Sequence, residues 1–439
     1  MLLRFLTAGK YEAVAEALVK LVIMTVGSYG DVAPFLGLGT RLRGSGHHVT
    51  LATQESFADV VREHGLGFAP LPGNTREVMA SDEGRSWTRS GSGLRAMKAQ
   101  SAIYQQFMRA LAEPVIAAAD GADALLLQAV PATHGYLVAK AMGIPGVLLG
   151  LTPSVPTEEF LPAMFGDRSL GRWGNRALMR LGPAMLKSLD GVVDDLQTRL
   201  GLPTTGMAAV RREMFFDDAD LPILDGYSPL VSPRPRDWRP GANVVGYWWP
   251  PHPPRWEPPA ELTEFLAAGP APVFVGFGSH GHGDAERLGE IVAAATRRAR
   301  VRAVVQAGWA GLPGTDGDVL TVGSVPHDWL FPRMAAVVHH AGAGTTGAGL
   351  RAGVPAVPVP VLADQPFWAA RLVRLGVAPG AVRLKRLTAD RLAELIRQAV
   401  SEPGYRSRAT AVAERVRAED GAGRVAETLH RLGSTSRHH

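Results

Sequence analysis

The chain has 439 residues, which is enough for two globular domains. Hydrophobic residues make up 46% of it and charged residues 20%, a balance that is typical of a folded enzyme and excludes a disordered chain. There is no cysteine, so disulfides, zinc–thiolate sites and a cysteine nucleophile are excluded, and the composition fits a reducing cytoplasm. The net charge of +5 comes from scattered arginines without interleaved aromatic residues, so we expect no nucleic-acid partner.

Residues 1–20 are expected to form an N-terminal extension. Glu12, Glu16 and Lys20 interrupt its apolar residues, which is unlike a secretory signal peptide. No stretch of the chain approaches the roughly 20 consecutive apolar residues of a membrane span. We therefore expect a cytoplasmic protein, with peripheral membrane association left open.

The segment 21–226 alternates apolar strands with helical patterns. Strands are predicted at 21–26, 48–52, 122–128 and 146–150, and a helix at 32–43. This order predicts a parallel sheet with helices on both faces. The less regular stretches 70–120 and 153–215 are rich in aromatic residues, and they are expected either to line a binding cleft or to form a surface lid.

Proline and tryptophan crowd the segment 227–262, as in YWWPPHPPRWEPP, which predicts an extended linker because proline blocks helices and central strands. A second strand–helix series follows over 263–405. Its strands are predicted at 273–276, 302–306, 319–322, 336–339 and 356–359, and a helix at 388–400. One more helix is predicted at 410–432, within a C-terminal helix and tail over 406–439. The sequence thus predicts an α/β protein of two Rossmann-like domains.

The stretch 337–369, VVHHAGAGTTGAGLRAGVPAVPVPVLADQPFWA, indicates a phosphate site. A buried strand leads into two histidines and a turn of small residues, and Thr345 and Thr346 open a helical pattern. The first amides of a helix have no intrahelical partner, and the helix dipole attracts negative charge. Hydroxyls and the imidazole of His340 would add donors. The spacing is neither the Rossmann GxGxxG nor the Walker pattern, so it does not by itself name the phosphate ligand.

HHAGAGTTGAGLRAGVP followed by ADQPFWA resembles the donor signature of the UDP-dependent glycosyltransferases, in the branch of sterol glucosyltransferases and antibiotic (glycopeptide, macrolide) glycosyltransferases. The stretches VGSYGDVAPFLGLGTRLRGSGHHVTLAT, VVGYWWPPHPPRWEPPAEL and GSVPHDWLFP agree in order, so the resemblance covers about residues 21–400. It implies the GT-B fold, in which two Rossmann-like domains face a central cleft and the C-terminal helix crosses back to the N-terminal domain. Residues 21–226 would bind the acceptor and 263–405 the nucleotide-sugar donor.

Asp31 is the candidate catalytic base. It follows the first strand on a turn bounded by Gly27 and Gly30, and the carboxyl ends of parallel strands face the ligand crevice. The antibiotic and sterol branch uses the Asp of GSRGD; this chain reads GSYGD, with Tyr29 in place of the arginine. The alternative is that Asp31 only caps the following helix.

The resemblance implies further donor contacts. The leaving diphosphate would be held by donors on three turns, without a metal: Ser28, Ser279, His340, Gly342, Gly344, Thr345 and Thr346. Asp364 and Gln365 would bind the sugar hydroxyls, which favours UDP-glucose over a deoxysugar donor. The nucleoside would contact Trp309, Val325 and His327. The base-stacking Trp and ribose-binding Glu of the plant members are replaced by Ser324 and Ala348, so the exact nucleotide does not follow from them.

Two other signals carry alternatives. His134, at a predicted helix start, would orient Asp31 or the acceptor, or else is a capping or core histidine. Asp218 and Asp220 form a DxD pair that binds a metal in another class of glycosyltransferases, but they lie away from the donor motifs and are expected to form a solvated turn.

We therefore predict an inverting glycosyltransferase that needs no cofactor besides its UDP-sugar co-substrate. It would move a hexose to a hydroxyl of a hydrophobic small molecule, such as a sterol or a natural-product aglycone. A sugar-nucleotide epimerase and a non-catalytic sugar-nucleotide binding protein are the alternatives. The sequence leaves the acceptor and the oligomeric state open.

Overall fold

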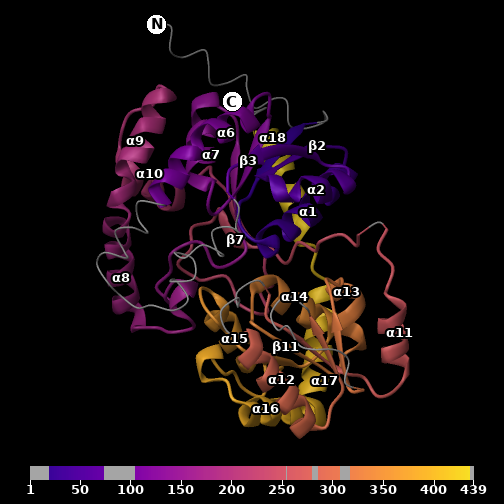
Figure 1. Cartoon of the computed structure of the whole chain (residues 1–439). Helices are drawn as coiled ribbons and strands as arrows, with labels where there is room; N and C mark the ends of the chain where they lie inside the picture. The colour runs from indigo at the N-terminus through magenta and orange to yellow at the C-terminus, as the bar shows by residue number, and fades with distance from the viewer. Residues whose placement is uncertain (1–18, 74–103, 254, 279–284, 307–316, 436–439) are drawn as a thin grey trace, which may run out of the picture.

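The computed structural model describes residues 19–73, 104–253, 255–278, 285–306 and 317–435, and Figure 1 shows their arrangement. Two α/β domains, each built around a parallel sheet, lie one above the other in that view. Within the described part of the chain, no helix is both long and apolar enough to span a bilayer.

The first sheet has seven strands in the order β3-β2-β1-β4-β5-β6-β7, and every neighbouring pair is parallel. Its strands are β1 Lys20–Met24, β2 His48–Gln54, β3 Gly67–Leu71, β4 Ala124–Gln128, β5 Gly146–Gly150, β6 Ile223–Asp225 and β7 Ala242–Val244. The strand order reverses between β1 and β4, so the crevice at their carboxyl ends is the expected ligand site of this domain. Part of the segment predicted as a linker thus forms β7, an edge strand.

The second sheet has five parallel strands in the order β10-β9-β8-β11-β12. They are β8 Val273–Gly276, β9 Ala303–Gln306, β10 Val319–Val322, β11 Ala336–His339 and β12 Ala356–Pro358. Here the order reverses between β8 and β11, and the phosphate-like turn of the sequence directly follows β11.

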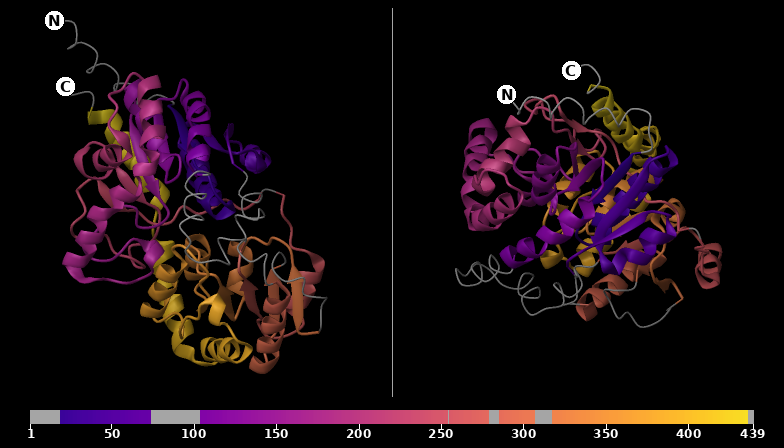
Figure 2. Two further views of the ribbon diagram at one scale, coloured as in Figure 1. Left: turned by 60° about the vertical axis from the view of Figure 1, so that its left-hand side comes forward. Right: turned by 90° about the horizontal axis from the view of Figure 1, so that it is seen from above.

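Helices cover both faces of both sheets (Figures 1 and 2). Those of the first domain are α1 Tyr29–Gly44, α2 Ala58–Glu63, α6 Ala112–Ala119, α7 Ala132–Met142, α8 Gly171–Met185, α9 Asp190–Arg199 and α10 Gly206–Arg212. Those that follow are α11 Ala260–Ala267, α12 Ala285–Ala299, α13 His327–Leu330, α14 Ala343–Ala352, α15 Gln365–Arg374, α16 Ala389–Ser401, α17 Pro403–Arg417 and α18 Gly421–Thr435.

The strands read as continuous apolar runs because helices cover both faces of each sheet. Ile23 and Met24 are adjacent in β1 and both fully buried, but they pack into different core clusters on opposite faces of the sheet. A strand that is buried on both faces has no polar side, which is why β1 reads as an unbroken apolar run.

The prediction of one helix over 410–432 is wrong, because α17 and α18 are separate helices. The helix is interrupted at residues 418–420, where the chain passes from the second domain to the first. Asp420 accepts a hydrogen bond from the N–H of Gly423 at 2.9 Å and starts α18. A Cβ on Gly421 would lie 2.3 Å from the carbonyl oxygen of Gly246, so the two backbones meet at this crossing. Helix α17 packs on α14, whereas α18 returns to α1 (Figure 1).

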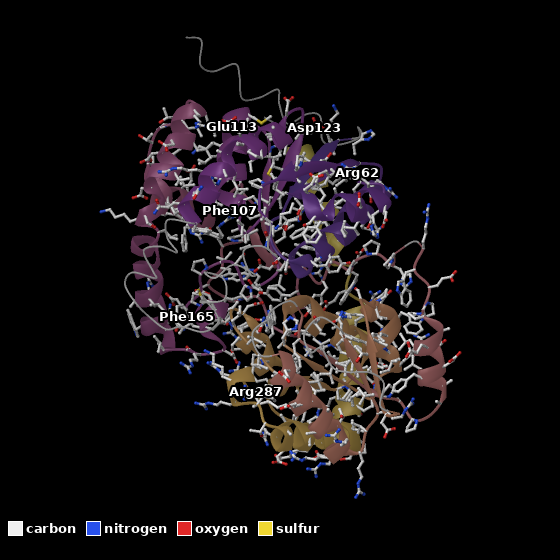
Figure 3. The ribbon with its side chains drawn as sticks, viewed as in Figure 1. Arg62, Phe107, Glu113, Asp123, Phe165 and Arg287 are labelled. Carbon is white, nitrogen blue, oxygen red and sulfur yellow. The ribbon has the colours of Figure 1, made fainter. Side chains whose placement is uncertain are left out.

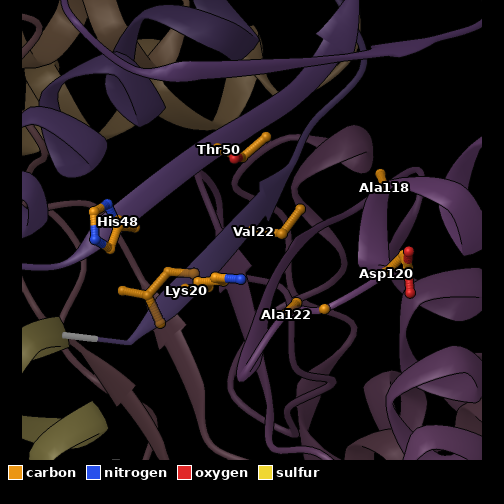
Figure 4. A pocket seen from close by; sticks show the side chains of 9 residues that line it. Lys20, Val22, His48, Thr50, Ala118, Asp120 and Ala122 are labelled. Atoms are coloured by element: carbon orange, nitrogen blue, oxygen red, sulfur yellow. The ribbon is translucent and has the colours of Figure 1, made fainter. Parts of the chain in front are cut away.

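A hollow of about 320 Å³ lies at the amino ends of β1 and β2 (Figure 4). Lys20, His48, Thr50 and Asp120 are among the residues that line it. It opens at the edge of the sheet opposite the strand carboxyl ends, so it is separate from the candidate site described next.

Candidate active site

The turn from β1 into α1 presents Asp31. Ser28 caps α1, and Asp31 is the third residue of the helix. The N–H and the Oγ–H of Ser28 both donate to Asp31 Oδ2, at 2.7 and 2.9 Å. The hydroxyl of Thr25, just after β1, donates to the Asp31 carbonyl at 3.0 Å. The carboxylate therefore sits in a capping box, as the helix-cap alternative requires, and at the sheet edge where a base is expected.

Gly27 makes this arrangement sterically possible. A Cβ on Gly27 would lie 2.3 Å from Asp31 Oδ2 and 2.7 Å from Asp31 Cβ. The N–H of Gly27 donates to Gln54 Oε1 at the end of β2. The glycine thus gives the carboxylate room to fold back over the turn.

The turn from β11 into α14 has the features of an anion site. Ala341 has a positive φ of 61°, which is unusual for a residue with a Cβ, and Gly342 is the N-cap of α14. The helix begins at Ala343, two residues earlier than predicted. Its first backbone N–H groups lie beyond the reach of intrahelical carbonyls, and its dipole adds partial positive charge at this end.

Two histidines support this turn. The N–H of Ala341 donates to His339 Nδ1 at 3.1 Å, and burial lowers the pKa of His339 to about 3, so this imidazole is neutral. The ring of His340 lies between two glycine turns. A Cβ on Gly342 would approach its Nε2 to 2.5 Å, and one on Gly278, just after β8, would approach its Cε1 to 3.0 Å. His340 therefore joins the β8 and β11 turns; Ser279 lies outside the described residues.

The two threonines of the motif differ in accessibility. Gly344 is exposed, Thr345 is half-buried, and Thr346 is buried. Within the described residues, Thr346 Oγ1 has no hydrogen-bond partner. A buried hydroxyl without a partner at a helix N-terminus is a group that a bound anion would satisfy.

The loop between β12 and α15 carries the predicted sugar-binding pair. Ala363 again has a positive φ, of 53°, and Asp364 follows as the N-cap of α15. Trp368 Nε1 donates to Asp364 Oδ2 at 2.6 Å. Gln365 Oε1 accepts from the N–H groups of Val361 and Leu362, so its amide nitrogen is the end with donors for a sugar.

Asp31 and Asp364 come from different domains, and the charge of Asp31 acts on Asp364. Burial raises the pKa of Asp364, and the negative charge of Asp31 raises it further, against the lowering effect of the Trp368 hydrogen bond. Helix α1 of the first domain and helix α14 of the second are in contact, which brings the helices of the two candidate turns together.

The predicted nucleoside contacts lie at the end of β10. Val325 is buried, and the ring of His327 stacks on Phe331 with centroids 4.3 Å apart. Burial lowers the pKa of His327 to about 4, so its imidazole is neutral. Trp309 lies outside the described residues.

His134 is buried in α7, and the DxD pair shapes a turn. His134 is 1% exposed in α7, and burial lowers its pKa to about 4, which suits the core-histidine alternative. Asp218 accepts hydrogen bonds from the N–H groups of Asp220 and Leu221 and from the hydroxyl of Tyr136. It shapes a turn, and no group of metal-ligating side chains is found anywhere in the described ranges.

Comparisons with known proteins identify the family of the chain. Residues 21–160 match the glycosyltransferase family 28 N-terminal domain, and residues 289–432 match the C-terminal domain of erythromycin biosynthesis protein CIII-like proteins. The chain is 37% identical to O-mycaminosyltylonolide 6-deoxyallosyltransferase of Streptomyces fradiae, covering 92% of this chain and 94% of that one. It is 32% identical to a sterol 3-beta-glucosyltransferase of Arabidopsis thaliana, covering 94% and 68%. The crystal structure of the glycotransferase of kitacinnamycin superposes with a TM-score of 0.71 at 21% identity, over 95% of this chain and 99% of that one.

The chain belongs to the glycosyltransferases of the GT-B fold, in the branch that contains sterol glucosyltransferases and macrolide glycosyltransferases. The predicted fold and enzyme class are thus confirmed.

Proposed function

We propose that the chain is an inverting, metal-independent glycosyltransferase that moves glucose from UDP-glucose to a hydroxyl of a hydrophobic small molecule. The observation that carries this proposal is that α1, whose first turn holds Asp31, contacts α14 of the second domain, whose N-terminus has the features of an anion site. A general base, a sugar-binding carboxylate and an anion site are the three groups that transfer from a nucleotide sugar needs.

In the proposed reaction, Asp31 takes the proton of the acceptor hydroxyl as its oxygen attacks the anomeric carbon. The bond from that carbon to the diphosphate oxygen breaks, and its electron pair leaves with the nucleoside diphosphate. The negative charge of the leaving group develops at the amides of α14, beside His340, Thr345 and Thr346. Because the attack is in line, the anomeric configuration inverts.

The donor sugar is the finer part of the proposal. One relative is named as a deoxyallosyltransferase and the other as a glucosyltransferase, so the relatives differ in the sugar. We favour glucose because Asp364 and the amide of Gln365 offer an acceptor and donors to hydroxyls that a deoxysugar lacks.

A hydrophobic acceptor is supported by the first domain. Met164, Phe165, Leu170 and Trp173 are exposed within a short stretch before and at the start of α8, and Trp173 is 83% exposed. Large exposed apolar side chains mark interaction sites. We propose a sterol or a natural-product aglycone as the acceptor and a cytoplasmic enzyme, with peripheral membrane contact as a variant that liposome co-sedimentation tests.

The test is release of UDP from UDP-glucose with a panel of sterols, macrolides and flavonoids, in the presence and absence of EDTA. We expect release that depends on an acceptor and survives EDTA. Release of dTDP from a dTDP-deoxysugar, without release of UDP from UDP-glucose, would overturn the proposal that UDP-glucose is the donor. Release abolished by EDTA would overturn metal independence. UDP binding without release for any acceptor or donor would favour a binding protein, and a changed sugar on UDP would favour an epimerase.

A further inference from the structure

Trp368 holds the carboxylate that is proposed to bind the donor sugar. It lies one helical turn after Asp364 on α15, is fully buried, and donates its indole N–H to Asp364 Oδ2 at 2.6 Å. An indole nitrogen only donates, so this bond favours the ionised carboxylate and selects which oxygen faces the tryptophan. Hydrogen bonds to a charged partner are the stronger kind.

The other side of Trp368 contacts the first domain. The ring of Tyr227, two residues after β6, packs edge-on against Trp368 with centroids 5.3 Å apart and planes at 64°. Tyr227 is itself fully buried. The rotamer of Trp368 is therefore fixed by a residue of the domain that does not carry Asp364.

The rest of α15 is held against the first domain as well. Phe367 packs on Phe160 at 5.5 Å, and the guanidinium of Arg371 lies over both rings. Arg371 also pairs with Asp167 at 3.4 Å, and both side chains are largely buried. Asp167 lies just after the short helix η3, Ala163–Phe165, which packs against α15; Figure 3 marks Phe165 there.

We infer that Trp368 is a positioning residue that couples the domain interface to donor-sugar recognition. Contact with Tyr227 orients the indole, and the indole orients Asp364 so that Oδ1 is the oxygen presented to a sugar hydroxyl. Trp368 does not touch the substrate. The inference rests on the proposed role of Asp364, and it makes hexose selection depend on how the two domains meet.

The experiment compares Trp368→Phe with Asp364→Asn. For each variant, kcat and donor KM are measured with the nucleotide hexose and with the analogue that lacks the hydroxyl bound by Asp364. Loss of a hydrogen bond to a charged group corresponds to a change of about 10-fold or more in kcat/KM. We expect Trp368→Phe to lose about that much with the hexose and little with the deoxy analogue, so that the preference for the hexose falls.

Trp248→Phe is the matched control. Trp248 is also fully buried and packs on Phe35, but its indole nitrogen has no hydrogen-bond partner among the described residues. The same loss of ring volume should then lower the thermal midpoint without changing the hexose preference. Equal preferences for Trp368→Phe and Trp248→Phe would overturn the positioning role.

A variant on the first domain tests the same coupling if Trp368→Phe does not fold. Tyr227→Leu leaves the indole and Asp364 intact but removes the ring that orients them, and it should reduce the hexose preference in the same direction. Unchanged preference in a folded Tyr227→Leu would overturn the coupling. An unchanged preference in Asp364→Asn would instead refute the proposed role of Asp364 itself.

Discussion

Replacing Gly27 with Ala should displace the proposed base while leaving its carboxylate in the chain. The added Cβ would lie 2.3 Å from Asp31 Oδ2, 2.6 Å from Cγ and 2.7 Å from Cβ. Because the Asp31 Cβ is included, rotation of the side chain cannot relieve the overlap, and the turn itself must shift. Both hydrogen bonds from Ser28 to Asp31 would then be lost or lengthened.

The size of the effect follows from these contacts. Loss of an N-terminal cap costs about 1 kcal/mol of stability, and loss of a positioned base costs about 10²–10⁴-fold in rate. We therefore expect Gly27→Ala to unfold about 1–2 kcal/mol more easily and to turn over at least about 100-fold more slowly. Chemical denaturation and initial rates of nucleoside diphosphate release measure the two effects.

Gly30→Ala is the control in the same turn. A Cβ there would meet Ser28 Oγ at 3.6 Å, an ordinary contact, and Ala favours the helix that begins at Tyr29. It should keep wild-type turnover. Near-normal turnover in Gly27→Ala, or an equal loss in Gly30→Ala, would refute the steric argument.

Three further changes test other parts of the structure. Burial raises the pKa of Asp225 from its ordinary value of 3.8 to about 7. As pH rises, the unfolded chain therefore loses this proton first, and the free energy of unfolding should fall between about pH 4 and pH 7. Asp225→Asn should flatten that part of a stability–pH curve, and an unchanged slope would contradict the prediction. Thr346→Val removes a buried hydroxyl without a partner among the described residues, so the free energy of unfolding should not change while the affinity for UDP, measured by calorimetry, falls about 5–10-fold. An unchanged affinity would show that the Thr346 hydroxyl does not bind the diphosphate. Gly421→Ala places a Cβ 2.3 Å from the Gly246 carbonyl oxygen and should lower the free energy of unfolding by about 1–3 kcal/mol. Gly191→Ala in α9, where a Cβ would meet open space, should leave it unchanged. Equal melting temperatures for the two variants would refute the close contact of the backbones at Gly421 and Gly246.

The sequence predicts best those elements whose signal is local. The strands at Val273–Gly276, Val319–Val322 and Ala336–His339 have the predicted bounds, because each is a short apolar run with turn residues beside it. β3 is less visible, since it contains Pro70 and only one buried residue, Leu71. A proline in a short, half-exposed run resembles a loop, although an edge strand tolerates it.

Contacts between distant segments could not be read from the sequence. The early start of α14 depends on the positive φ of Ala341, a conformation that alanine does not signal. The break between α17 and α18 depends on Gly421 meeting Gly246, far away in the chain. Asp31 and Asp364 could be chosen from their motifs, but the role of Trp368 depends on Tyr227 in the other domain. Motif spacing locates each turn, and only the fold brings the turns together.

The central claim is that Asp31 is the base and not only a helix cap, and Asp31→Asn tests it directly. Asn can still accept the hydrogen bonds from Ser28, so α1 should keep its cap and the protein its stability. The measurement is acceptor-dependent release of UDP, with calorimetric binding of UDP alongside it. We expect turnover to fall about 10²–10⁴-fold while UDP affinity is unchanged. Turnover at the wild-type rate in this variant would contradict the mechanism and leave Asp31 as a cap.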